Sequence, residues 1–459
     1  MAQVETIRTW VERRMPELVA AHRVPALSLA IGLGDETIEF ATGILNRATG
    51  VEATTDAVFQ IGSVTKVFTA TLVMQLVDEG LLGLDQAVRD ILPGFRVADA
   101  DASARITVRQ LLSHSSGFEG DVFVDTGAGD DNLERYVDIL AETPQLFAPG
   151  EMFSYNNAGF STLGRLVEVL RGAPYDRVLR ERLLDPLGLR HAAVDAEEAI
   201  LHRTAVGHLR TAAGDIAPTT VWSMERSGSP AGSRLAMSAR DLLGFGRLHL
   251  AGGVAADGSR MLSTASVEDM RRPQVRLPDI DQGVAWGLGW ELFARDGRVL
   301  PGHDGNTIGQ SACLRLLPEE GVAVAVLANG GDPHPVFAEL VDEVLREVAG
   351  IGQKETPAAS GPAPHDARRF VGRYESSTAI TTISRTDDGR LWLDRTPRGV
   401  VADLGDLPYR TELVSWRVDV LLPVDPEGGV RQPIAFLGDD GTGRAAHLHT
   451  GRADRRMDS

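Results

Sequence analysis

The chain has 459 residues, and its 46 basic and 64 acidic side chains give a formal net charge of −18. Apolar residues make up 43% and charged residues 24% of the sequence, a composition that excludes a wholly disordered chain. The acidic excess argues against binding to phosphate backbones or anionic lipid. The length exceeds what one hydrophobic core usually supports, so we expect two domains.

The first predicted element is an amphipathic helix over residues 9–21. Residues 1–18 lack the apolar core of roughly 7–15 residues that a secretory signal needs, and no stretch reaches the ~20 apolar residues of a membrane span. The single cysteine, Cys313, excludes an intramolecular disulfide. We therefore expect a cytoplasmic protein that is stabilised by packing.

Two predicted strands, 26–31 and 37–41, follow the first helix. Residues 64–79 are apolar on nearly every face and stop before Gly80, which predicts a buried helix. The remaining predicted elements are helices at 108–113, 157–171, 239–250 and 335–348, and strands at 286–292, 311–317 and 322–328. Strands towards both ends with helices between them predict an α+β domain whose terminal strands share one sheet.

The composition changes at Gly350, so the first domain is predicted to cover residues 1–350. Residues 351–367 are rich in Pro, Ala and Gly, which is typical of a linker. After the linker, short runs of alternating apolar and polar residues are separated by Gly, Asp and Pro turns. This pattern predicts a small antiparallel β domain, a sheet or a barrel, over residues 368–459.

The strongest chemical signal lies at the start of the predicted buried helix, where Ser63 and Lys66 are three residues apart. Residues at this spacing share a helix face, so the amine can reach the hydroxyl. Burial beside an apolar helix lowers the pKa of an amine and lets it act as a base. A serine at a helix N-terminus also offers its backbone N–H to a developing oxyanion. The S-x-x-K pattern alone occurs by chance in many helices.

Two later segments complete a larger pattern: SYNNAGF, with Tyr155 and Asn157, and PGHDGNTIG, with His303. Together with DAVFQIGSVTK, ITVRQLLSHSSGF and AGSRLAMSARDLLGFG, these segments resemble the serine acyl-transferases of the β-lactamase and penicillin-binding-protein superfamily, in the same order. The resemblance covers nearly all of the chain before the linker. It implies a β-lactamase/D,D-peptidase-like domain, an antiparallel sheet flanked by helices with an additional all-helical part.

The resemblance also implies a role for each matching residue. Ser63 is the expected nucleophile, Lys66 its partner base and Tyr155 the group that relays protons. The sequence does not decide whether Lys66 or Tyr155 is the base in acylation, because the two groups share protons in one network. Asn157 matches the asparagine that positions Lys66 and the substrate amide. The backbone N–H groups of Ser63 and Asn306 are expected to form the oxyanion hole.

His303 and Gly305 belong to a triplet in which members that bind penicillins usually have lysine or histidine first and glycine last. A lysine is a cation near neutral pH and holds the penicillin carboxylate, whereas a histidine with an ordinary pKa of ~6.5 is only partly charged. We therefore expect carboxylate recognition to be weaker or pH-dependent at His303, which argues against a β-lactamase. Gly305 is expected to line the substrate site.

Other chemistries find less support. His114, in LLSHSSGF, suggests a Ser-His-Asp triad with Ser63, but the resemblance identifies this segment as a structural turn. No G-x-S-x-G elbow of an α/β-hydrolase is present, and without an H-E-x-x-H motif or clustered Cys and His residues we expect no metal and no cofactor. A non-catalytic ligand-binding module is disfavoured because all four residues of the motif set are present.

The second domain narrows the substrate class. The segment RRFVGRYES resembles the start of the lipocalin-like C-terminal domain of some members. The combination is similar to the penicillin-binding-protein-type thioesterases of nonribosomal peptide assembly, which release a peptidyl thioester from a carrier protein as a macrocyclic peptide and favour a D-configured C-terminal residue. The alternative is a cytosolic serine hydrolase, an esterase, a D-amino-acid peptidase or a β-lactamase-like enzyme.

In those thioesterases the second domain can supply an arginine to the active site. Arg444 and Arg452 are the candidates here, and Arg234 would line the cleft on similar grounds; each can also be a solvated surface arginine. Carrier proteins are typically acidic, so docking to this acidic chain needs a local basic patch. We expect no nucleic-acid or membrane partner.

Overall fold

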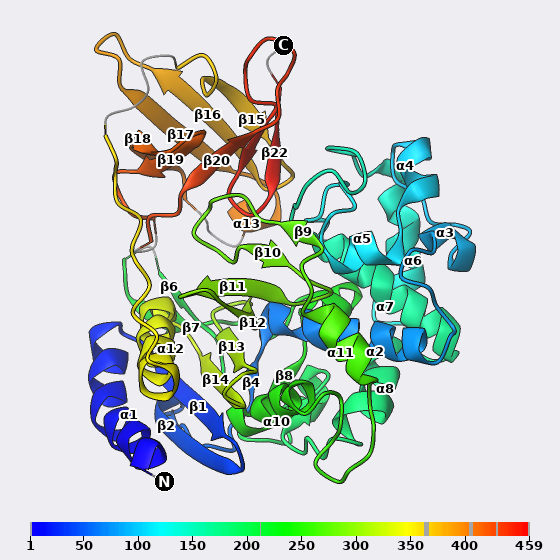
Figure 1. Cartoon of the computed structure of the whole chain (residues 1–459), viewed down its shortest axis with the longest axis vertical. Coiled ribbons are helices and arrows are strands. Elements are labelled where there is room, and N and C mark those ends of the chain that lie inside the picture. Colours follow the sequence, from blue (N-terminus) through cyan, green and yellow to red (C-terminus); the bar gives the residue numbers. More distant parts are fainter. Residues whose placement is uncertain (1, 212, 362–366, 404–406, 428–429, 458–459) are drawn as a thin grey trace.

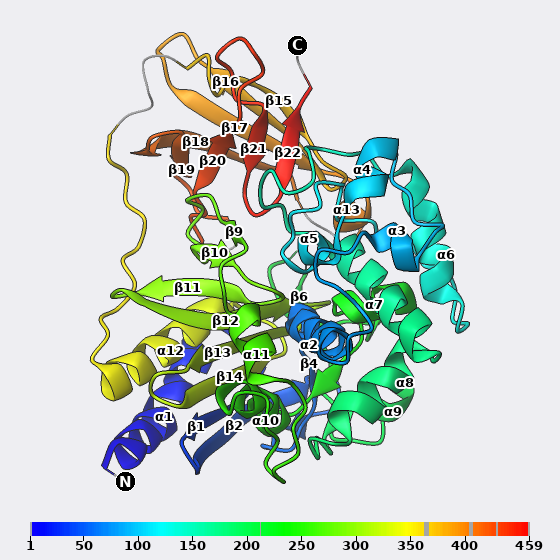
Figure 2. The same ribbon diagram turned by 45° about the vertical axis from the view of Figure 1, so that its right-hand side comes forward.

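The structure, a computed structural model, describes residues 2–211, 213–361, 367–403, 407–427 and 430–457. Figure 1 shows two parts: a sheet covered by helices, and a small barrel above it. Residues 351–361, which lead from the first part towards the second, run as an extended segment along one side of the molecule, drawn in yellow in Figure 2. Residues 362–366 of the predicted linker lie outside the described residues.

The central sheet has nine antiparallel strands in the order β3-β2-β1-β14-β13-β12-β11-β10-β9. Strand β1 pairs with β14, so strands from the two ends of the first part share one sheet, as predicted. Strand β14 is buried along its whole length because helices cover both faces of the sheet. The strands are β1 (Ala26–Leu33), β2 (Glu36–Asn46), β3 (Val51–Glu52), β9 (Val275–Arg276), β10 (Ala285–Trp286), β11 (Glu291–Arg295), β12 (Arg298–Asn306), β13 (Ser311–Leu317) and β14 (Val322–Ala328).

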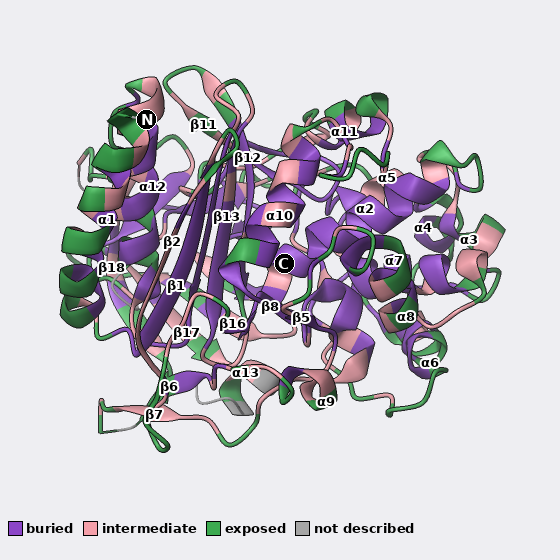
Figure 3. Ribbon diagram, turned by 90° about the horizontal axis from the view of Figure 1, so that it is seen from below, coloured by how far each residue is buried: buried purple, intermediate pink, exposed green. Residues whose placement is uncertain are grey.

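Helices α1 (Ala2–Ala21) and α12 (Pro333–Ala349) cover one face of the sheet, and α10 (Ala239–Leu250) covers the other, with α2 (Thr65–Asp78) beyond it. Figure 3 shows these two layers on either side of the buried strands. Each interface holds its own cluster of buried apolar side chains. Helix α2 is buried on almost every face because it lies between the sheet and the helical part.

The helical part lies beside α2 and away from α1 and α12 (Figure 1). Helix α7 (Asn157–Arg171) begins directly after the SYN segment, and Gly172, the residue that follows it, adopts a left-handed conformation. The other elements outside the central sheet are α3 (Val88–Ile91), α4 (Ala100–Arg105), α5 (Val108–Leu112), α6 (Asn132–Ile139), α8 (Tyr175–Leu179), α9 (Ala196–Ala199), α11 (Thr264–Met270), the short helical turns η1 (Gly62–Val64), η2 (Leu140–Glu142), η3 (Arg180–Leu184) and η4 (Arg226–Ala231), and the short strands β4 (Phe59–Gln60), β5 (Ala192–Ala193), β6 (His208–Arg210), β7 (Ile216–Pro218) and β8 (Ala236–Met237).

The prediction of one strand over residues 286–292 is wrong, because β10 and β11 are separated by a turn. Gly289 in this turn has a φ of +85°, and a Cβ on it would lie 2.5 Å from the Cβ of Ala70 on α2. The backbone therefore crosses directly over the helix, where only glycine fits. Residues 298–306 were not predicted as a strand, yet they form β12, and His303 lies inside this strand.

The C-terminal part is a closed antiparallel barrel, which makes the predicted β domain a barrel rather than an open sheet. The first strand pairs with the last, Tyr374 opposite Arg456, so the described strands leave no open edge. Apolar side chains, among them Phe370, Leu413 and Phe436, fill its interior. The elements are β15 (Gly372–Glu375), β16 (Ala379–Arg385), β17 (Leu391–Pro397), α13 (Val400–Asp403), β18 (Tyr409–Arg417), β19 (Val420–Pro423), β20 (Ile434–Leu437), β21 (His447–His449) and β22 (Ala453–Arg456).

None of the helices in the described ranges combines the length and the apolar character that crossing a membrane requires.

Candidate active site

Ser63 lies in η1, the tight turn that leads from β4 into α2, and Lys66 lies in the first turn of α2. Gly62 has a left-handed φ of +53°, and a Cβ on it would lie 2.6 Å from the backbone nitrogen of Asn306. Only glycine therefore lets this turn approach the end of β12 so closely. The local sequence thereby brings the Ser63 backbone against β12.

Lys66 is fully buried, and its Nζ lies 3.1 Å from Ser63 Oγ and 2.6 Å from the carbonyl oxygen of Ala231. Burial lowers the pKa of the Lys66 amine well below its ordinary value, and the charge of Arg452 lowers it further, while Asp121 raises it. A neutral amine donates a hydrogen to Ala231 and keeps a lone pair for the hydroxyl proton of Ser63. The pair is arranged as a nucleophile and its base.

Tyr155 lies in the extended segment before α7. Its ring stacks on His114 with 4.3 Å between ring centroids, and Lys66 Nζ lies 4.8 Å from the centroid of the Tyr155 ring. Burial raises the pKa of the Tyr155 phenol, although a hydrogen bond with Ser63 and the charge of Arg452 act in the opposite direction. The phenol therefore keeps its proton at neutral pH, and the arrangement suits it to donate a proton while Lys66 accepts one.

Asn157 is the first residue of α7, and its Nδ2 donates to Asp121 Oδ1 at 2.6 Å. Within the described residues no hydrogen bond joins Asn157 to Lys66, the contact that the sequence resemblance implies. The neighbouring Asn156 caps the helix, because its Oδ1 accepts from the Gly159 N–H at 2.6 Å. The cap fixes the start of α7 and so the direction in which Asn157 leaves the backbone.

His303 lies in β12, and its Nδ1 donates to the carbonyl oxygen of Asp304 at 2.6 Å. Burial lowers the pKa of His303 to about 3, and the charge of Lys66 acts in the same direction. The ring is therefore neutral near pH 7, where its ordinary pKa alone implied a partial charge. With its proton on Nδ1, the ring offers Nε2 as a hydrogen-bond acceptor instead of a cation.

The backbone N–H groups of Ser63 and Asn306 lie beside each other because the surrounding residues are glycines. A Cβ on Gly305 would lie 3.0 Å from Ser63 N and 1.9 Å from the carbonyl oxygen of Ile61, and a Cβ on Gly232 would lie 2.9 Å from Ser63 N. Two backbone N–H groups next to a nucleophile are the arrangement that stabilises the oxyanion of a tetrahedral intermediate.

Arg452 enters the site from the barrel, at the turn between β21 and β22. Its Nη2 donates to Asp121 Oδ1 at 3.2 Å, and its Cζ lies 5.1 Å from the centroid of the Tyr155 ring. The Arg452 side chain is 40% exposed, whereas that of Asp121 is 3% exposed. The barrel therefore places a cation, partly open to solvent, directly beside Tyr155.

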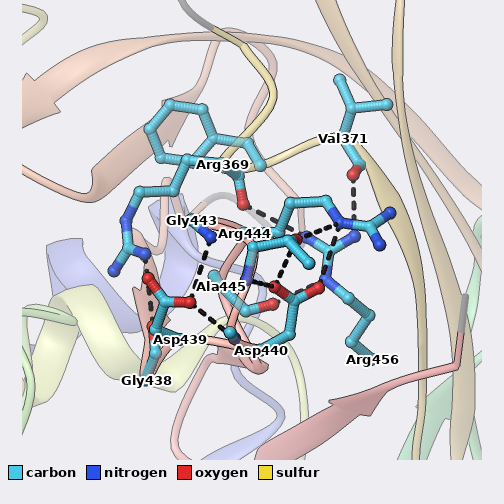
Figure 4. Close-up of polar contacts among 12 residues, drawn as sticks. Arg369, Val371, Gly438, Asp439, Asp440, Gly443, Arg444, Ala445 and Arg456 are labelled. Atoms are coloured by element: carbon cyan, nitrogen blue, oxygen red, sulfur yellow. Dashed lines mark hydrogen bonds and ion pairs between the residues drawn. The ribbon is translucent and has the colours of Figure 1, made fainter. Parts of the chain in front are cut away.

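The other two candidate arginines lie elsewhere. Arg444 lies in the loop between β20 and β21, where its Nε donates to Asp440 Oδ2 at 3.0 Å; Figure 4 shows this loop beside Arg456, at the far end of β22 from Arg452. The Arg234 guanidinium lies 3.7 Å from the carboxylate of Glu197. Neither residue lines the cavity that contains Ser63.

That cavity has a volume of about 920 Å³ and runs between the two parts of the molecule. Its reacting end is lined by Ser63, Tyr155, Asn157, Trp286, His303 and Arg452. Gln432 of the barrel and Ile280 of the loop before β10 line it further out. Ligand pockets usually measure about 300–1,000 Å³, so there is room for a substrate much longer than one amino acid.

The sequence did not predict that His114 lies against Tyr155 or that Asp121 binds Asn157. His114 does not form a Ser-His-Asp triad, because its Nδ1 accepts from the Asn156 N–H at 2.9 Å and its ring lies against Tyr155. Its φ of +56° agrees with a turn. Asp121 holds both Asn157 and Arg452, yet no motif marks it; its place a few residues after the HSSGF turn is the one available signal.

Known proteins resemble this chain over most of its length. The family model described as Beta-lactamase matches residues 11–349. The chain is 46% identical to "Penicillin-binding protein 4" of Amycolatopsis lactamdurans over 370 residues, which cover 80% of this chain and 97% of the relative.

Two solved structures are similar over different shares of the chain. SurE, solved with D-Leu, has a TM-score of 0.78 and 27% identity, and the match covers 99% of this chain and 100% of SurE. The D-amino acid amidase of Ochrobactrum anthropi, solved with L-phenylalanine amide, has a TM-score of 0.63 and 26% identity, covering 76% of this chain and 99% of the amidase. The likeness to SurE therefore extends over the sheet domain and the barrel.

Proposed function

We propose that this chain, which belongs to the Beta-lactamase family, releases a peptidyl thioester with a D-configured C-terminal residue and closes the peptide head to tail. The general chemistry, that of a serine hydrolase or acyl-transferase, follows from the family. The observation that carries the specific proposal is the barrel that covers the active site, with Arg452 beside Tyr155 and a large cavity over Ser63.

In the proposed acylation step, neutral Lys66 takes the hydroxyl proton of Ser63, and Ser63 Oγ attacks the thioester carbonyl. The N–H groups of Ser63 and Asn306 stabilise the oxyanion of the tetrahedral intermediate. When the intermediate collapses, the C–S bond breaks and the thiol leaves with a proton that Tyr155 supplies and Lys66 restores. The peptide is now an ester of Ser63.

In the proposed second step, the peptide's own N-terminal amine attacks the ester carbonyl. Neutral Lys66 or the network it shares with Tyr155 takes a proton from the amine, and Ser63 Oγ leaves as a hydroxyl. A cavity of about 920 Å³ supports this step because both ends of a peptide have room there. Cover by the barrel also supports it, since limited access of water to the ester favours the amine as nucleophile.

The neutral His303 supports a substrate whose leaving group has no carboxylate. Members of the superfamily that bind penicillins use a cation at this position to hold a carboxylate, whereas the buried ring of His303 offers an acceptor. A thioester leaving group carries no charge next to the reacting carbonyl. The whole-chain likeness to SurE, solved with D-Leu, supports the D-configured residue.

Hydrolysis of an ester or a D-amino-acid amide is the second candidate. It is supported by the likeness of the sheet domain to a D-amino acid amidase. Both candidates share the Ser63 ester and differ in whether water or an amine attacks it. The partner of the proposed cyclase is a peptidyl carrier protein; neither candidate needs a nucleic acid, a membrane or a metal.

Mass spectrometry after incubation with a peptidyl thioester that ends in a D-residue separates the two candidates. We expect a product lighter than the linear acid by one water, the mass of the macrocycle, and no such product from the same peptide ending in an L-residue. Linear acid alone would contradict the cyclase and support the hydrolase. The Ser63→Ala variant is expected to lose turnover and covalent labelling at unchanged melting temperature, and retained turnover would rule out the Ser63 ester.

A further inference from the structure

We propose that His449, in barrel strand β21, is a positioning residue for Tyr155, so that the barrel takes part in the proton transfer. The inference rests on the proposed function, in which Tyr155 moves protons to and from the reacting groups. It is carried by a set of hydrogen bonds between the β21–β22 hairpin and residues 153–155, the segment that ends in the Tyr155 ring.

Both ring nitrogens of His449 take part in this contact. The Tyr155 N–H donates to Gly451 O at 3.0 Å, and the Gly451 N–H donates to His449 Nδ1 at 3.1 Å. His449 Nε2 donates in turn to Phe153 O at 2.8 Å. Because Nδ1 accepts and Nε2 donates, only the neutral ring with its proton on Nε2 satisfies both bonds. His449 thus joins the two ends of the segment through one rigid ring.

The sheet domain holds the same segment from the opposite side. The Ser154 N–H donates to His114 O at 2.9 Å, the Asn156 N–H donates to His114 Nδ1 at 2.9 Å, and the His114 ring stacks on Tyr155. Residues 153–156 belong to no helix or strand, so they have no regular hydrogen bonding of their own. The position of the Tyr155 ring therefore depends on two histidines, one from each part of the molecule.

The turn that His449 holds also carries Arg452. Gly451 has a φ of +113°, a conformation that other residues rarely adopt, and a Cβ on it would lie 3.3 Å from Gln282 Nε2. The following residue, Arg452, lies beside Tyr155 and pairs with Asp121. His449 therefore fixes the turn of the barrel from which Arg452 reaches the side of Tyr155.

A proton-transfer group that is displaced by about 1 Å loses on the order of 100-fold in rate. Loss of the His449 ring is expected to displace Tyr155 without removing any group that contacts substrate. The change should therefore lower kcat and leave KM nearly unaltered.

A double-mutant cycle tests this expectation in the full chain, with a peptidyl thioester ending in a D-residue as substrate. We expect His449→Ala to lower kcat by about 10- to 100-fold with KM within about threefold. In the Tyr155→Phe background, His449→Ala should lower kcat by less than about threefold, because the Tyr155 hydroxyl that His449 is proposed to position is already absent. Equal losses in both backgrounds would overturn the proposal. If Tyr155→Phe leaves kcat unchanged, the proposed function fails and the role of His449 fails with it.

Two conservative variants separate the two bonds of the ring. In His449→Asn the new amide oxygen reaches the place of Nδ1 and keeps an acceptor for the Gly451 N–H, whereas in His449→Gln the longer side chain places its amide at Nε2 and keeps a donor for Phe153 O. His449→Asn should recover more kcat than His449→Gln, since Gly451 binds Tyr155 directly. If neither variant exceeds His449→Ala, the hydrogen bonds are not the cause of the effect.

His447 is a matched control on the same strand. It lies two residues earlier, so it faces the same side of β21, and its Nε2 lies 3.3 Å from Leu146 O of the sheet domain. We expect His447→Ala to lower the melting temperature about as much as His449→Ala while kcat stays within about twofold. An equal fall of kcat in both variants would show general loosening of the interface and contradict the positioning role.

Discussion

At the scale of single residues, the site depends on amine and imidazole groups that burial keeps neutral. Lys66 is fully buried, and none of the ion pairs found among the described residues involves it. Its pKa therefore falls well below the ordinary value, while burial lowers that of His303 to about 3. The neutral amine is the form that can accept the Ser63 proton, so burial suits Lys66 to the role of base in the proposed function.

This assignment predicts the pH dependence of acylation. As the pH falls through the pKa of Lys66, the amine takes up a proton and the rate of Ser63 acylation should fall; above that pKa the rate should be constant. His303 stays neutral on both sides of pH 6.5, so His303→Asn should leave the midpoint of the acid limb unmoved. The measurement is the rate of ester formation on Ser63 between pH 4 and 9.

Lys66→Arg is the matched variant for this profile. Its guanidinium keeps its proton throughout the range, so acylation should fall by at least about 100-fold at every pH. If the midpoint of the acid limb moves in His303→Asn, or if Lys66→Arg still forms the Ser63 ester, the base is a group other than Lys66.

At the scale of elements, helix α7 packs on η4 beside the candidate catalytic side chains. Helix α7 begins two residues after Tyr155, and η4 ends at Ala231, whose carbonyl oxygen accepts from Lys66. The two elements meet closely at Gly164, where a Cβ would lie 2.2 Å from Pro230 Cγ. Ser161 Oγ also donates to Ser227 O at 2.8 Å across this contact. Glycine at position 164 therefore lets α7, which starts next to Tyr155, pack closely on η4, which supplies the hydrogen-bond acceptor of Lys66.

We expect Gly164→Ala to force α7 and η4 apart. Overpacking of a core contact costs about 1–3 kcal/mol, so the free energy of unfolding should fall by that amount, and kcat should fall with it. Gly94→Ala is the control, because no atom lies within 4 Å of a Cβ at Gly94 and its φ is not left-handed. That change should leave stability equal or raise it by up to about 1 kcal/mol. Denaturant unfolding and kcat are the measurements, and equal behaviour of the two variants would contradict the argument.

At the scale of the whole molecule, the barrel is held against the sheet domain by apolar contact as well as by the β21–β22 hairpin. Ile280, in the loop before β10, is 1% exposed and packs against Val420 and Ala435 of the barrel. The ion pair between Arg417 and Asp279 is 55% and 54% exposed, and such surface pairs contribute about 0–1 kcal/mol. The interface therefore depends on Ile280 more than on Arg417.

Ile280→Asp should separate the barrel from the active site, because a buried, unpaired carboxylate is unfavourable. We expect kcat/KM to fall by at least tenfold and proteolysis in the linker to become faster, while Ser63 still reacts with small esters. Val418→Asp adds the same charge to the same barrel at a residue that is 91% exposed, and it should change neither measurement. Unaltered kcat/KM in Ile280→Asp would mean that the barrel is dispensable for catalysis.

Charge is also distributed unevenly over the molecule. Residues 367–459 contain 14 arginines, no lysine and 14 acidic residues, so the whole excess of 18 negative charges belongs to residues 1–366. The carrier protein of the proposed function would, if acidic, be repelled least on the barrel side, the side from which Arg452 approaches Tyr155.

Elements with a strong local pattern were predicted to within a few residues. Helices α7 and α10 and strands β13 and β14 have the predicted bounds, because helical or buried-strand periodicity is a property of consecutive residues. The strand prediction at 286–292 was wrong because the backbone turns at Gly289 where it passes close to Ala70, a residue more than 200 positions away in the chain. Strand β12 was missed because PGHDGN has the composition of a turn.

Local periodicity and short motifs were enough to predict the fold class and the family, and they also led to the candidate residues Ser63, Lys66, Tyr155 and His303 and to the division of the chain into two domains. Other features became visible only in the tertiary structure: Arg452 rather than Arg444 lies beside Tyr155, Asn157 binds Asp121, and the His449 ring binds the carbonyl oxygen of Phe153. These contacts join residues up to 331 positions apart, and the burial that sets the charge of Lys66 and His303 is contributed by all the elements around them. Distance and burial are properties of the packed molecule, so no local pattern encodes them.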